Sequence, residues 1–336
     1  MLYVGVDAHQ ETSQITVMEE SGRVVKRANV RSSRKGVRRA LAGYRRPLSA
    51  VLEASRSWGP MYDWLEELSQ EVILAHPAKV RAIAEARIKT DKIDSETLAH
   101  LLRADLIPQA YAPSREVRAT KRVLRQRMFM VRVRTMLKNR IKALLAQYEV
   151  TPPKVTDLFG KQGRLWLEQL RLPHPDGPLL CEDLELFAVL SKRIANTETL
   201  IDEIAKGDPV VDWLGSLPGI GDFFSVLIRY EVDRIDRFRS AKKFASYTGL
   251  VPSTYASGSR QVHGRLTKQG NKWLRWAFIE AVSPAVRVSP FLKHHYRRIK
   301  ARRGAKDARA STARKLAELT WTIWTEKRVY EERRNI

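Results

Sequence analysis

The sequence predicts an α/β domain at the N-terminal end, a long helical segment in the middle and a mainly α-helical C-terminal domain. Three features predict this fold class. Short apolar runs separated by turn residues fill residues 1–75, a helical pattern free of proline and glycine spans residues 114–148, and apolar residues recur at helical spacing from residue 179 onward. We therefore expect three parts, at residues 1–110, 111–208 and 209–336.

The N-terminal part begins with three short strands and continues with alternating helices and strands. The first strands are expected at Leu2–Val6, Gln14–Met18 and Arg23–Val30. Helices at residues 35–44 and 58–69 then alternate with strands at residues 48–52 and 72–75, and helical patterns at residues 78–86 and 93–103 follow. This order is typical of an RNase H-like fold, in which the first and fourth strands are neighbours.

Four carboxylates in this part favour a divalent-metal site. Asp7 and Glu53 each end an apolar strand, and neighbouring first and fourth strands would bring them together. Asp91 and Asp94 lie three residues apart and share one face of a helix. Carboxylate oxygens suit Mg²⁺ or Mn²⁺, which support phosphoryl transfer. The alternative is a set of unrelated surface acids and helix caps, but acids that end buried strands are costly to place without a cation.

The charge of the chain points to a nucleic-acid partner. Lysine and arginine number 61 against 37 acidic residues, which gives a net charge of +24. The excess concentrates in residues 115–142, with 11 basic residues and one acidic, and in residues 237–315, with 20 basic residues and two acidic. A surface kept basic only for solubility would mix the two signs more evenly, so phosphate binding is the better interpretation.

Cysteine usage and hydropathy exclude several classes of protein. Cys181 is the single cysteine, which rules out a disulfide framework within the chain and a thiolate metal cluster. No apolar run approaches the length of a membrane span, and the N-terminus leads directly into a strand rather than into a signal peptide. We expect a cytoplasmic protein that acts, if bacterial, on nucleoid DNA.

The middle part predicts two long helices. Residues 114–148 form a very basic helix, and residues 179–205 form a second helix with a regular apolar face. The two could pack as an antiparallel coiled coil. Two roles stay open for the first helix. It either closes a core or a dimer interface, or it contacts nucleic acid directly through Arg118, Arg122, Arg125 and Arg132.

A glycine-rich turn opens the C-terminal part. Leu217-Pro218-Gly219-Ile220-Gly221 precedes an apolar helix and resembles a helix-hairpin-helix element, in which Gly219 and Gly221 would hold a DNA phosphate. A glycine-rich helix cap uses the same residues, so the pattern alone is only moderately specific.

A loop rich in hydroxyl groups is expected beyond this turn, at residues 247–258. A serine hydroxyl is a weak nucleophile that needs help to lose its proton, and metal coordination can supply that help. From the chemistry alone the choice among Ser253, Ser257 and Ser259 stays open, because a Ser-Gly pair is usually only a turn.

Taken together, these motifs resemble the DEDD transposases of bacterial insertion sequences, which are related to Piv-type DNA invertases. In the N-terminal half the resemblance is to a RuvC-like domain and rests on Asp7, Glu53 and the stretch Lys89–Asp94. The C-terminal half is similar to the family's transposase domain through Leu217–Gly221, Gly249–Pro252, Ser257-Gly258 and Gly264–Arg275. The two halves occur in the family's order.

The resemblance implies a recombinase that cuts and rejoins DNA. In this family the four acids hold metal in one domain, and a serine of the other domain, which Ser257 matches, attacks DNA to form a phosphoserine bond. Some members are guided by a structured bridge RNA that pairs with donor and target DNA. Basic residues close to the serine would bind or neutralise phosphate: Arg265, Lys268, Lys272 and Arg275.

Two other functions remain open at this point. A nuclease of the Holliday-junction-resolvase kind could use the same acids to activate water, and a non-enzymatic nucleic-acid-binding protein could use them only to organise its fold. If two DNA duplexes are exchanged, four strands must be cut, so we expect a homodimer that assembles to a tetramer.

Overall fold

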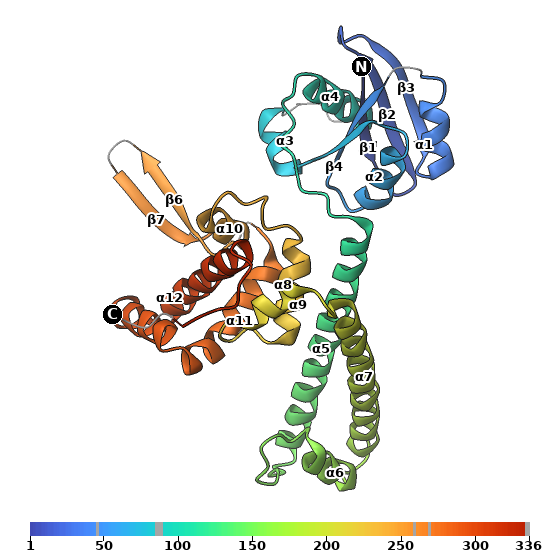
Figure 1. Cartoon of the computed structure of the whole chain (residues 1–336). Helices are drawn as coiled ribbons and strands as arrows, with labels where there is room; N and C mark the ends of the chain where they lie inside the picture. Colours follow the sequence, from blue (N-terminus) through green and yellow to red (C-terminus); the bar gives the residue numbers. More distant parts are fainter. Residues whose placement is uncertain (45–46, 85–89, 258–259, 268–269, 333–336) are drawn as a thin grey trace. The chain divides into compact units, whose positions relative to one another are not determined.

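The computed structural model describes residues 1–44, 47–84, 90–257, 260–267 and 270–332, without the side chains of residues 253–265. The chain divides into two compact units, Met1–Ala112 and Pro113–Ile336 (Figure 1). Each unit has hydrophobic cores of its own. None of the helices in the described ranges is both long and apolar enough to cross a membrane.

The first unit is built on a mixed five-stranded sheet. Its strand order is β3-β2-β1-β4-β5, with β1 antiparallel to β2 and parallel to β4. The sequence prediction of an RNase H-like arrangement is confirmed at this level: five strands form one sheet, and helices follow. The strand bounds are β1 (Leu2–Ala8), β2 (Thr12–Glu19), β3 (Val24–Arg31), β4 (Leu48–Glu53) and β5 (Glu71–Ala75).

Helices cover both faces of the sheet because its central strands are apolar on both sides. Val4 and Val6 pack in one core with residues of α1 (Arg34–Leu41) and α2 (Trp58–Glu66). Tyr3 and Val51 face the opposite way and pack in a second core with residues of α3 (Pro77–Ile83) and α4 (Asp91–Arg103). The ends of β1 and β4 are thereby held between two helical layers.

The second unit begins with a helical hairpin. The long helices α5 (Arg115–Gln147) and α7 (Asp176–Ala205) pack against each other, and the short helix α6 (Lys161–Gln169) lies at the connection between them (Figure 1). Their shared core contains Leu137, Ile141, Leu145, Leu180 and Phe187. A second core joins α5 and α7 to the helices that follow, through Leu124, Met128, Ile201, Val226 and Ala277.

The remainder of the second unit is a helical bundle with one small sheet. Its helices are α8 (Pro209–Gly215), α9 (Asp222–Val232), α10 (Ala241–Tyr247), α11 (Lys272–Val288) and α12 (Pro290–Thr325). The two-stranded sheet consists of β6 (Pro252–Ser257) and β7 (Arg260–Leu266). Residues 252–257 were expected in a loop, and the backbone there is an antiparallel strand instead.

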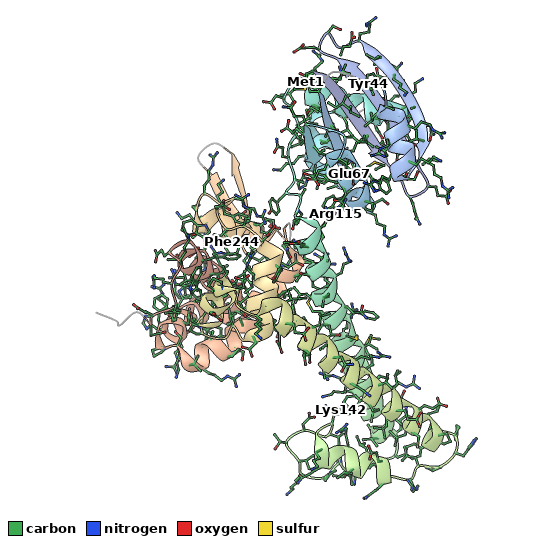
Figure 2. All side chains as sticks on the ribbon, turned by 45° about the vertical axis from the view of Figure 1, so that its right-hand side comes forward. Met1, Tyr44, Glu67, Arg115, Lys142 and Phe244 are labelled. Carbon is green, nitrogen blue, oxygen red and sulfur yellow. The ribbon has the colours of Figure 1, made fainter. Side chains whose placement is uncertain are left out.

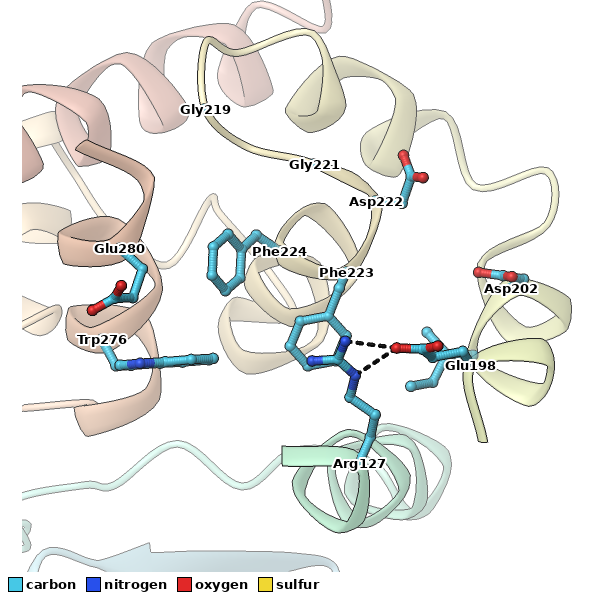
Figure 3. Close-up of a pocket in the computed structure, with 11 residues that line it drawn as sticks. Arg127, Glu198, Asp202, Gly219, Gly221, Asp222, Phe223, Phe224, Trp276 and Glu280 are labelled. Atoms are coloured by element: carbon cyan, nitrogen blue, oxygen red, sulfur yellow. Dashed lines mark hydrogen bonds and ion pairs between the residues drawn. The ribbon is translucent and has the colours of Figure 1, made fainter. Parts of the chain in front are cut away.

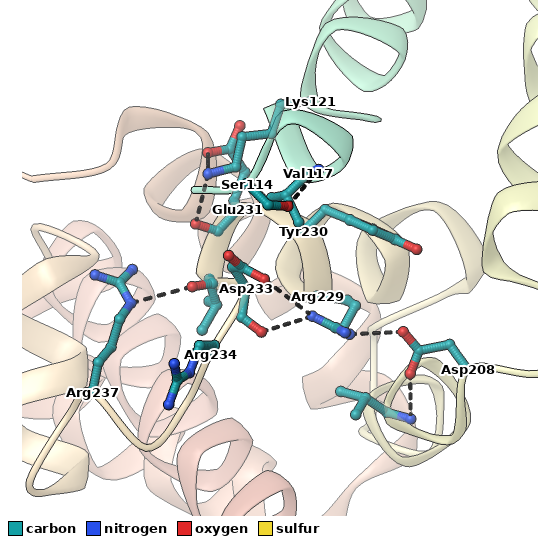
Figure 4. A network of polar contacts seen from close by, with 12 residues as sticks. Ser114, Val117, Lys121, Asp208, Arg229, Tyr230, Glu231, Asp233, Arg234 and Arg237 are labelled. Atoms are coloured by element: carbon teal, nitrogen blue, oxygen red, sulfur yellow. Dashed lines mark hydrogen bonds and ion pairs between the residues drawn. The ribbon is translucent and has the colours of Figure 1, made fainter. Parts of the chain in front are cut away.

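Charged pairs hold the C-terminal end of α9 in this bundle (Figure 4). Arg229 donates to the Asp208 carboxylate, with Nε 2.7 Å from Oδ2, and to the backbone carbonyl of Asp233 at 2.7 Å. On the other side of α9, Lys121 of α5 lies 3.8 Å from the carboxylate of the buried Glu231. These contacts fix the C-terminal end of α9 against α5 and the start of α8.

Candidate metal centre

The four predicted carboxylates lie at one edge of the first unit's sheet. The parallel register pairs Val6 with Leu52, so Asp7 and Glu53, one residue further on, emerge beside each other. Asp7, Glu53 and Asp94 together line a cavity of about 160 Å³. Asp91 lies at the rim, close to Asp7. The structure therefore brings together the acids that the sequence placed at strand ends and on one helix face.

Helix α4 is held directly over β1, which explains why its acids reach this edge. Gly5 permits the approach: a Cβ on it would collide with the backbone carbonyl of Ser95 and lie 2.7 Å from the Ala99 nitrogen. The Ser95 and Thr16 hydroxyls form a buried hydrogen bond of 2.9 Å. At the start of the helix the Thr90 side chain accepts a hydrogen bond from the backbone N–H of Ile93.

His9 joins the acids, although the sequence analysis did not single it out. Its Nε2 atom lies 3.1 Å from Oδ2 of Asp7 and 3.5 Å from Oδ1 of Asp91. The three side chains offer ligand atoms that all lie within 4.8 Å of one another. The sequence did contain one indication of His9. Side chains two residues apart in a strand lie on the same side of the chain, so His9 is expected on the same side as Asp7.

The electrostatics of the cluster favour a bound cation. Burial raises the pKa of the Asp7 carboxyl, the nearby negative charges of Asp91 and Asp94 raise it further, and His9 opposes the rise. Carboxylates that are close to one another in a partly buried place repel unless a cation neutralises them. The carboxylate oxygens fit Mg²⁺ or Mn²⁺, whereas the His9 imidazole is a ligand type that suits softer ions better.

Ser257 lies in the second unit, at the end of β6, where its backbone is in register with Arg260. Its side chain is outside the described part of the structure, as is that of Arg265 in β7, and Lys268 is outside it entirely. The choice among the three candidate serines therefore remains a prediction.

The basic residues predicted to contact nucleic acid have different environments. Arg125 donates to the buried Glu231 carboxylate, with Nη2 2.8 Å from Oε1, so its guanidinium is already engaged. Lys272 lies with its ammonium 4.8 Å from the centre of the Trp273 ring. Arg122 and Arg132 are exposed on α5. Arg118 and Arg275 are half-buried.

The glycine turn has a packing role that the sequence could not reveal. Gly219 has a φ of +79°, and a Cβ on it would collide with the carbonyl of Ala281 and lie 2.8 Å from the nitrogen of Ala285 in α11. Only glycine fits both the conformation and the space. The helix-hairpin-helix resemblance is therefore matched by a second explanation, close packing of the turn on α11.

Acids surround the same turn (Figure 3). Gly219 and Gly221 line a cavity of about 730 Å³ whose wall also carries four carboxylates and Arg127. Arg127 is paired with Glu198 at 2.6 Å and lies over the Phe223 ring. Carboxylates repel phosphate, so this geometry does not favour phosphate at the turn, and the phosphate contact of Gly219 and Gly221 stays a prediction. The acids are Glu198, Asp202, Asp222 and Glu280.

Comparison with known proteins agrees with both halves of the chain. A family model for DEDD transposases of IS110 elements, described as "Transposase", matches residues 4–150, which include all four acids. A second, described as "Transposase IS116/IS110/IS902 family", matches residues 211–297. The chain belongs to the IS110/IS116 transposase family. As a transposase of this family, it is a DNA recombinase of insertion sequences, an enzyme that cuts and rejoins DNA.

Relatives of this transposase match along nearly the whole chain. The "Probable family 20 transposase" of Pseudomonas aeruginosa is 25% identical over 97% of this chain and 98% of its own length. The "Transposase for insertion sequence element IS1111A" of Coxiella burnetii is 25% identical, covering 97% and 90%. The "Transposase for insertion sequence element IS1328" of Yersinia enterocolitica is 22% identical, covering 98% of each chain. A DEDD transposase domain implies a divalent metal ion, typically Mg²⁺.

Proposed function

We propose that this transposase exchanges DNA strands by metal-dependent phosphoryl transfer, with Ser257 as the nucleophile and a structured guide RNA selecting the DNA. The observation that carries the metal-dependent part is the convergence of Asp7, Glu53 and Asp94 on one cavity, with Asp91 and His9 at its rim. Strand-end acids gathered in this way are the arrangement that divalent ions need to act on phosphodiesters.

The acids would hold the metal, and His9 would complete or orient the ligand set. When bound, a divalent ion stabilises the negative charge that develops on the attacking and leaving oxygens. Arg81, which lines the same cavity, is placed to contact a phosphate oxygen. The carboxylates themselves gain from the ion, since its positive charge offsets the burial and the repulsion by Asp91 and Asp94 that raise the pKa of Asp7.

We assign Ser257 as the nucleophile of the strand-exchange step. This assignment rests on the resemblance of the segment around Ser257 to the family's transposase domain. Its Oγ attacks the phosphorus, a phosphoserine bond forms, and the P–O bond to one DNA strand breaks, leaving a free hydroxyl after proton transfer. In the reverse step a hydroxyl of the new partner strand attacks the phosphoserine and releases the serine. Because each phosphodiester is exchanged for another, no ATP is needed. We also propose that this domain is related to the Piv-type DNA invertases.

Exposed cations of α12 are the best-placed contacts for the nucleic acid. Residues 297–306 carry six basic side chains and no acid, and Gly304 interrupts the helix there with a φ of 83°. Among the described residues these cations form no ion pairs, unlike Arg125 and Arg127 of α5. They can therefore neutralise phosphates without breaking a contact. We add to them the predicted phosphate contacts Arg265, Lys268, Lys272 and Arg275.

The proposal also includes guidance by RNA and assembly of the protein into a tetramer. A recombinase that neutralises many phosphates without an evident base-reading element can leave sequence choice to base pairing. Four strand cleavages per exchange favour a tetramer of two dimers. We place the activity in the bacterial cytoplasm, on nucleoid DNA. Sequencing of RNA that copurifies with the protein tests guidance: one enriched structured RNA from the element's flank is expected, and recombination that survives RNase treatment contradicts it.

Trapping of the covalent intermediate tests the nucleophile. The protein is incubated with Mg²⁺, copurified RNA and duplex DNA spanning an end of its element, then denatured, and any adduct is mapped by mass spectrometry. We expect an adduct at Ser257 that is lost in Ser257→Ala and kept in the matched control Ser253→Ala. An adduct at Ser253 or Ser259 would contradict the residue assignment, and DNA cleavage without any adduct would identify water as the nucleophile.

A further inference from the structure

The cavity of about 730 Å³ beside the glycine turn has a charge opposite to that of the unit around it. Residues 113–336 carry 44 lysines and arginines against 23 acidic residues, and side chains with nitrogen at their tips extend from both the hairpin and the bundle (Figure 2). The wall of the cavity reverses this ratio, with four carboxylates and one cation, Arg127. A cavity whose volume is typical of small-molecule sites therefore has a negative wall in a positive protein.

Three helices supply the carboxylates of this wall. Glu198 and Asp202 are four residues apart and share one face of α7. Trp276 and Glu280 share one face of α11 in the same way. The first turn of α9, which starts at Asp222, lies between these two faces (Figure 3). The negative charge of the cavity is therefore set by helix faces far apart in the sequence, and it is spread over several elements.

One part of the wall already binds a cation that belongs to the chain itself. The Arg127 guanidinium donates two hydrogen bonds to the Glu198 carboxylate, at 2.6 and 3.0 Å. Its central carbon lies 4.1 Å from the centre of the Phe223 ring, and the arginine side chain is only 19% exposed. A carboxylate together with the face of an aromatic ring holds an organic cation away from water. The contacts of Arg127 thus show which chemistry this wall can recognise.

The rest of the wall offers the same groups without a buried cation. Phe224 and Trp276 meet edge to face with ring centres 5.3 Å apart, and Trp276 is 39% exposed. Asp202 and Asp222 form no ion pair with any residue that the structure describes. Glu280 has a solvent-exposed contact of 3.5 Å with an arginine of α12. Figure 3 shows Glu280 on one side of the phenylalanine rings and the two aspartates on the other, so cations can be bound at two separate points.

The separation of the acids decides which class of ligand fits. A metal ion needs ligand atoms that converge. In the described ranges, Asp7, His9 and Asp91 are the one group of three acids, histidines or cysteines whose ligand atoms lie within 4.8 Å of one another, and that group is not in this cavity. Phosphate is repelled by the carboxylates. A linear organic cation fits, because its amines can reach acids on both sides while its methylene groups lie against the rings between them.

We propose that this cavity binds an aliphatic polyamine. Its ammonium groups contact Asp202 and Asp222 on one side and Glu280 on the other, and its methylene chain packs on Phe224 and Trp276. The bound polyamine neutralises the acids beside the glycine turn, which removes their repulsion of a DNA phosphate at that turn. The metal centre and the proposed nucleophile take no part in this binding.

Calorimetric titration of the full-length protein with spermidine is the test, after removal of nucleic acid, which would itself bind the polyamine. We expect saturable binding of one spermidine per chain, because a net charge of +24 repels a polycation elsewhere on the surface. Asp222→Asn with Glu280→Gln should raise the dissociation constant at least ~10-fold, since a charged contact is lost on each side. Trp276→Leu should raise it about 3-fold through loss of the aromatic face.

The matched control is Glu185→Gln with Asp212→Asn, which removes two exposed acids of the same unit outside the cavity and should bind spermidine like wild type. Asp7→Asn should also bind normally, so a failure of the metal centre is distinguishable. Circular dichroism checks that each variant is folded. Absence of saturable binding by wild type, or equal weakening in the control, overturns the proposal. Displacement of spermidine by Mg²⁺ more readily than by NaCl of the same ionic strength also overturns it, because the site would then recognise charge alone.

Discussion

The Glu231 carboxylate, 1% exposed, accepts two hydrogen bonds from the Arg125 guanidinium, at 2.8 and 3.2 Å. Lys121 lies near the same carboxylate, and burial lowers the pKa of the lysine (Figure 4). The Asn271 side chain, which caps α11, donates to Glu231 at 2.8 Å. One buried acid thus ties together α5, α9 and the start of α11, and its partners include an arginine that the sequence assigned to nucleic acid.

Arg125→Ala is therefore predicted to destabilise the second unit rather than simply weaken nucleic-acid binding. Glu231 would keep Lys121 and Asn271 but lose the two donors of the charged guanidinium, which should lower the free energy of unfolding by about 1–3 kcal/mol. Urea unfolding measures this change. Arg298→Ala, an exposed cation of α12, is the control and should change stability by less than ~0.5 kcal/mol. Equal stability of the two variants would contradict the structural role.

Gly5→Ala is predicted to disturb the metal centre from a distance. The added Cβ meets the backbone of α4, which cannot yield as a side chain would, so α4 must move away from β1. Overpacking of this kind costs about 1–3 kcal/mol, and the shift displaces Asp91 and Asp94. We expect lower thermal stability and weaker Mn²⁺ binding by calorimetry. Gly215→Ala, where a Cβ meets nothing within 4 Å, should change neither.

Asp7→Asn is predicted to stabilise the metal-free protein at neutral pH. Since the folded-state pKa of Asp7 is raised, mainly by burial, folding binds protons between the unfolded value of 3.8 and the higher folded value. Stability is therefore lost as pH rises through this window, and the loss is complete above it. The variant should melt higher than wild type at pH 7 in chelator, with the difference shrinking toward acid pH, and should gain nothing from Mg²⁺.

Glu11→Gln is the matched control for this prediction, since Glu11 is an exposed acid of the same unit outside the cluster. It should melt like wild type in chelator and retain the Mg²⁺-dependent rise. An Asp7→Asn protein that melts lower than wild type in chelator at pH 7 would show that the carboxylate is stabilised by its surroundings, contrary to the effect of burial and of the repulsion by Asp91 and Asp94.

Arg302→Gln with Arg303→Gln is predicted to reduce the salt dependence of binding to a short DNA duplex. Each lost phosphate contact should flatten the slope of log affinity against log salt by about 0.9, so the pair should change it by nearly two. Arg122→Gln with Arg132→Gln should leave the slope unchanged, because the proposed phosphate contacts lie on α12 and not on α5. Filter binding at several salt concentrations distinguishes the two helices. A flatter slope for the α5 variant together with an unchanged slope for the α12 variant would assign the phosphate contacts to α5.

The sequence by itself determined the sheet and the gathering of its acids. Apolar runs of strand length, followed by Asp7 and Glu53, can only place those carboxylates at strand ends, and an i, i+3 spacing puts Asp91 and Asp94 on one helix face. These are local patterns, and local geometry suffices to interpret them. Strands β6 and β7 were not predicted, because hydroxyl and glycine residues weaken the apolar alternation that marks a strand.

Only the tertiary structure decided which side chains meet across long stretches of chain. His9 lies close to Asp91 because α4 packs on β1 at Gly5, and Arg125 donates a hydrogen bond to Glu231, 106 residues away. Likewise, Leu186 and Phe187 of α7 are both apolar in the sequence, but packing within the second unit buries Phe187 and leaves Leu186 47% exposed. Spacing fixes which residues share a face, whereas burial depends on what the rest of the chain brings to that face.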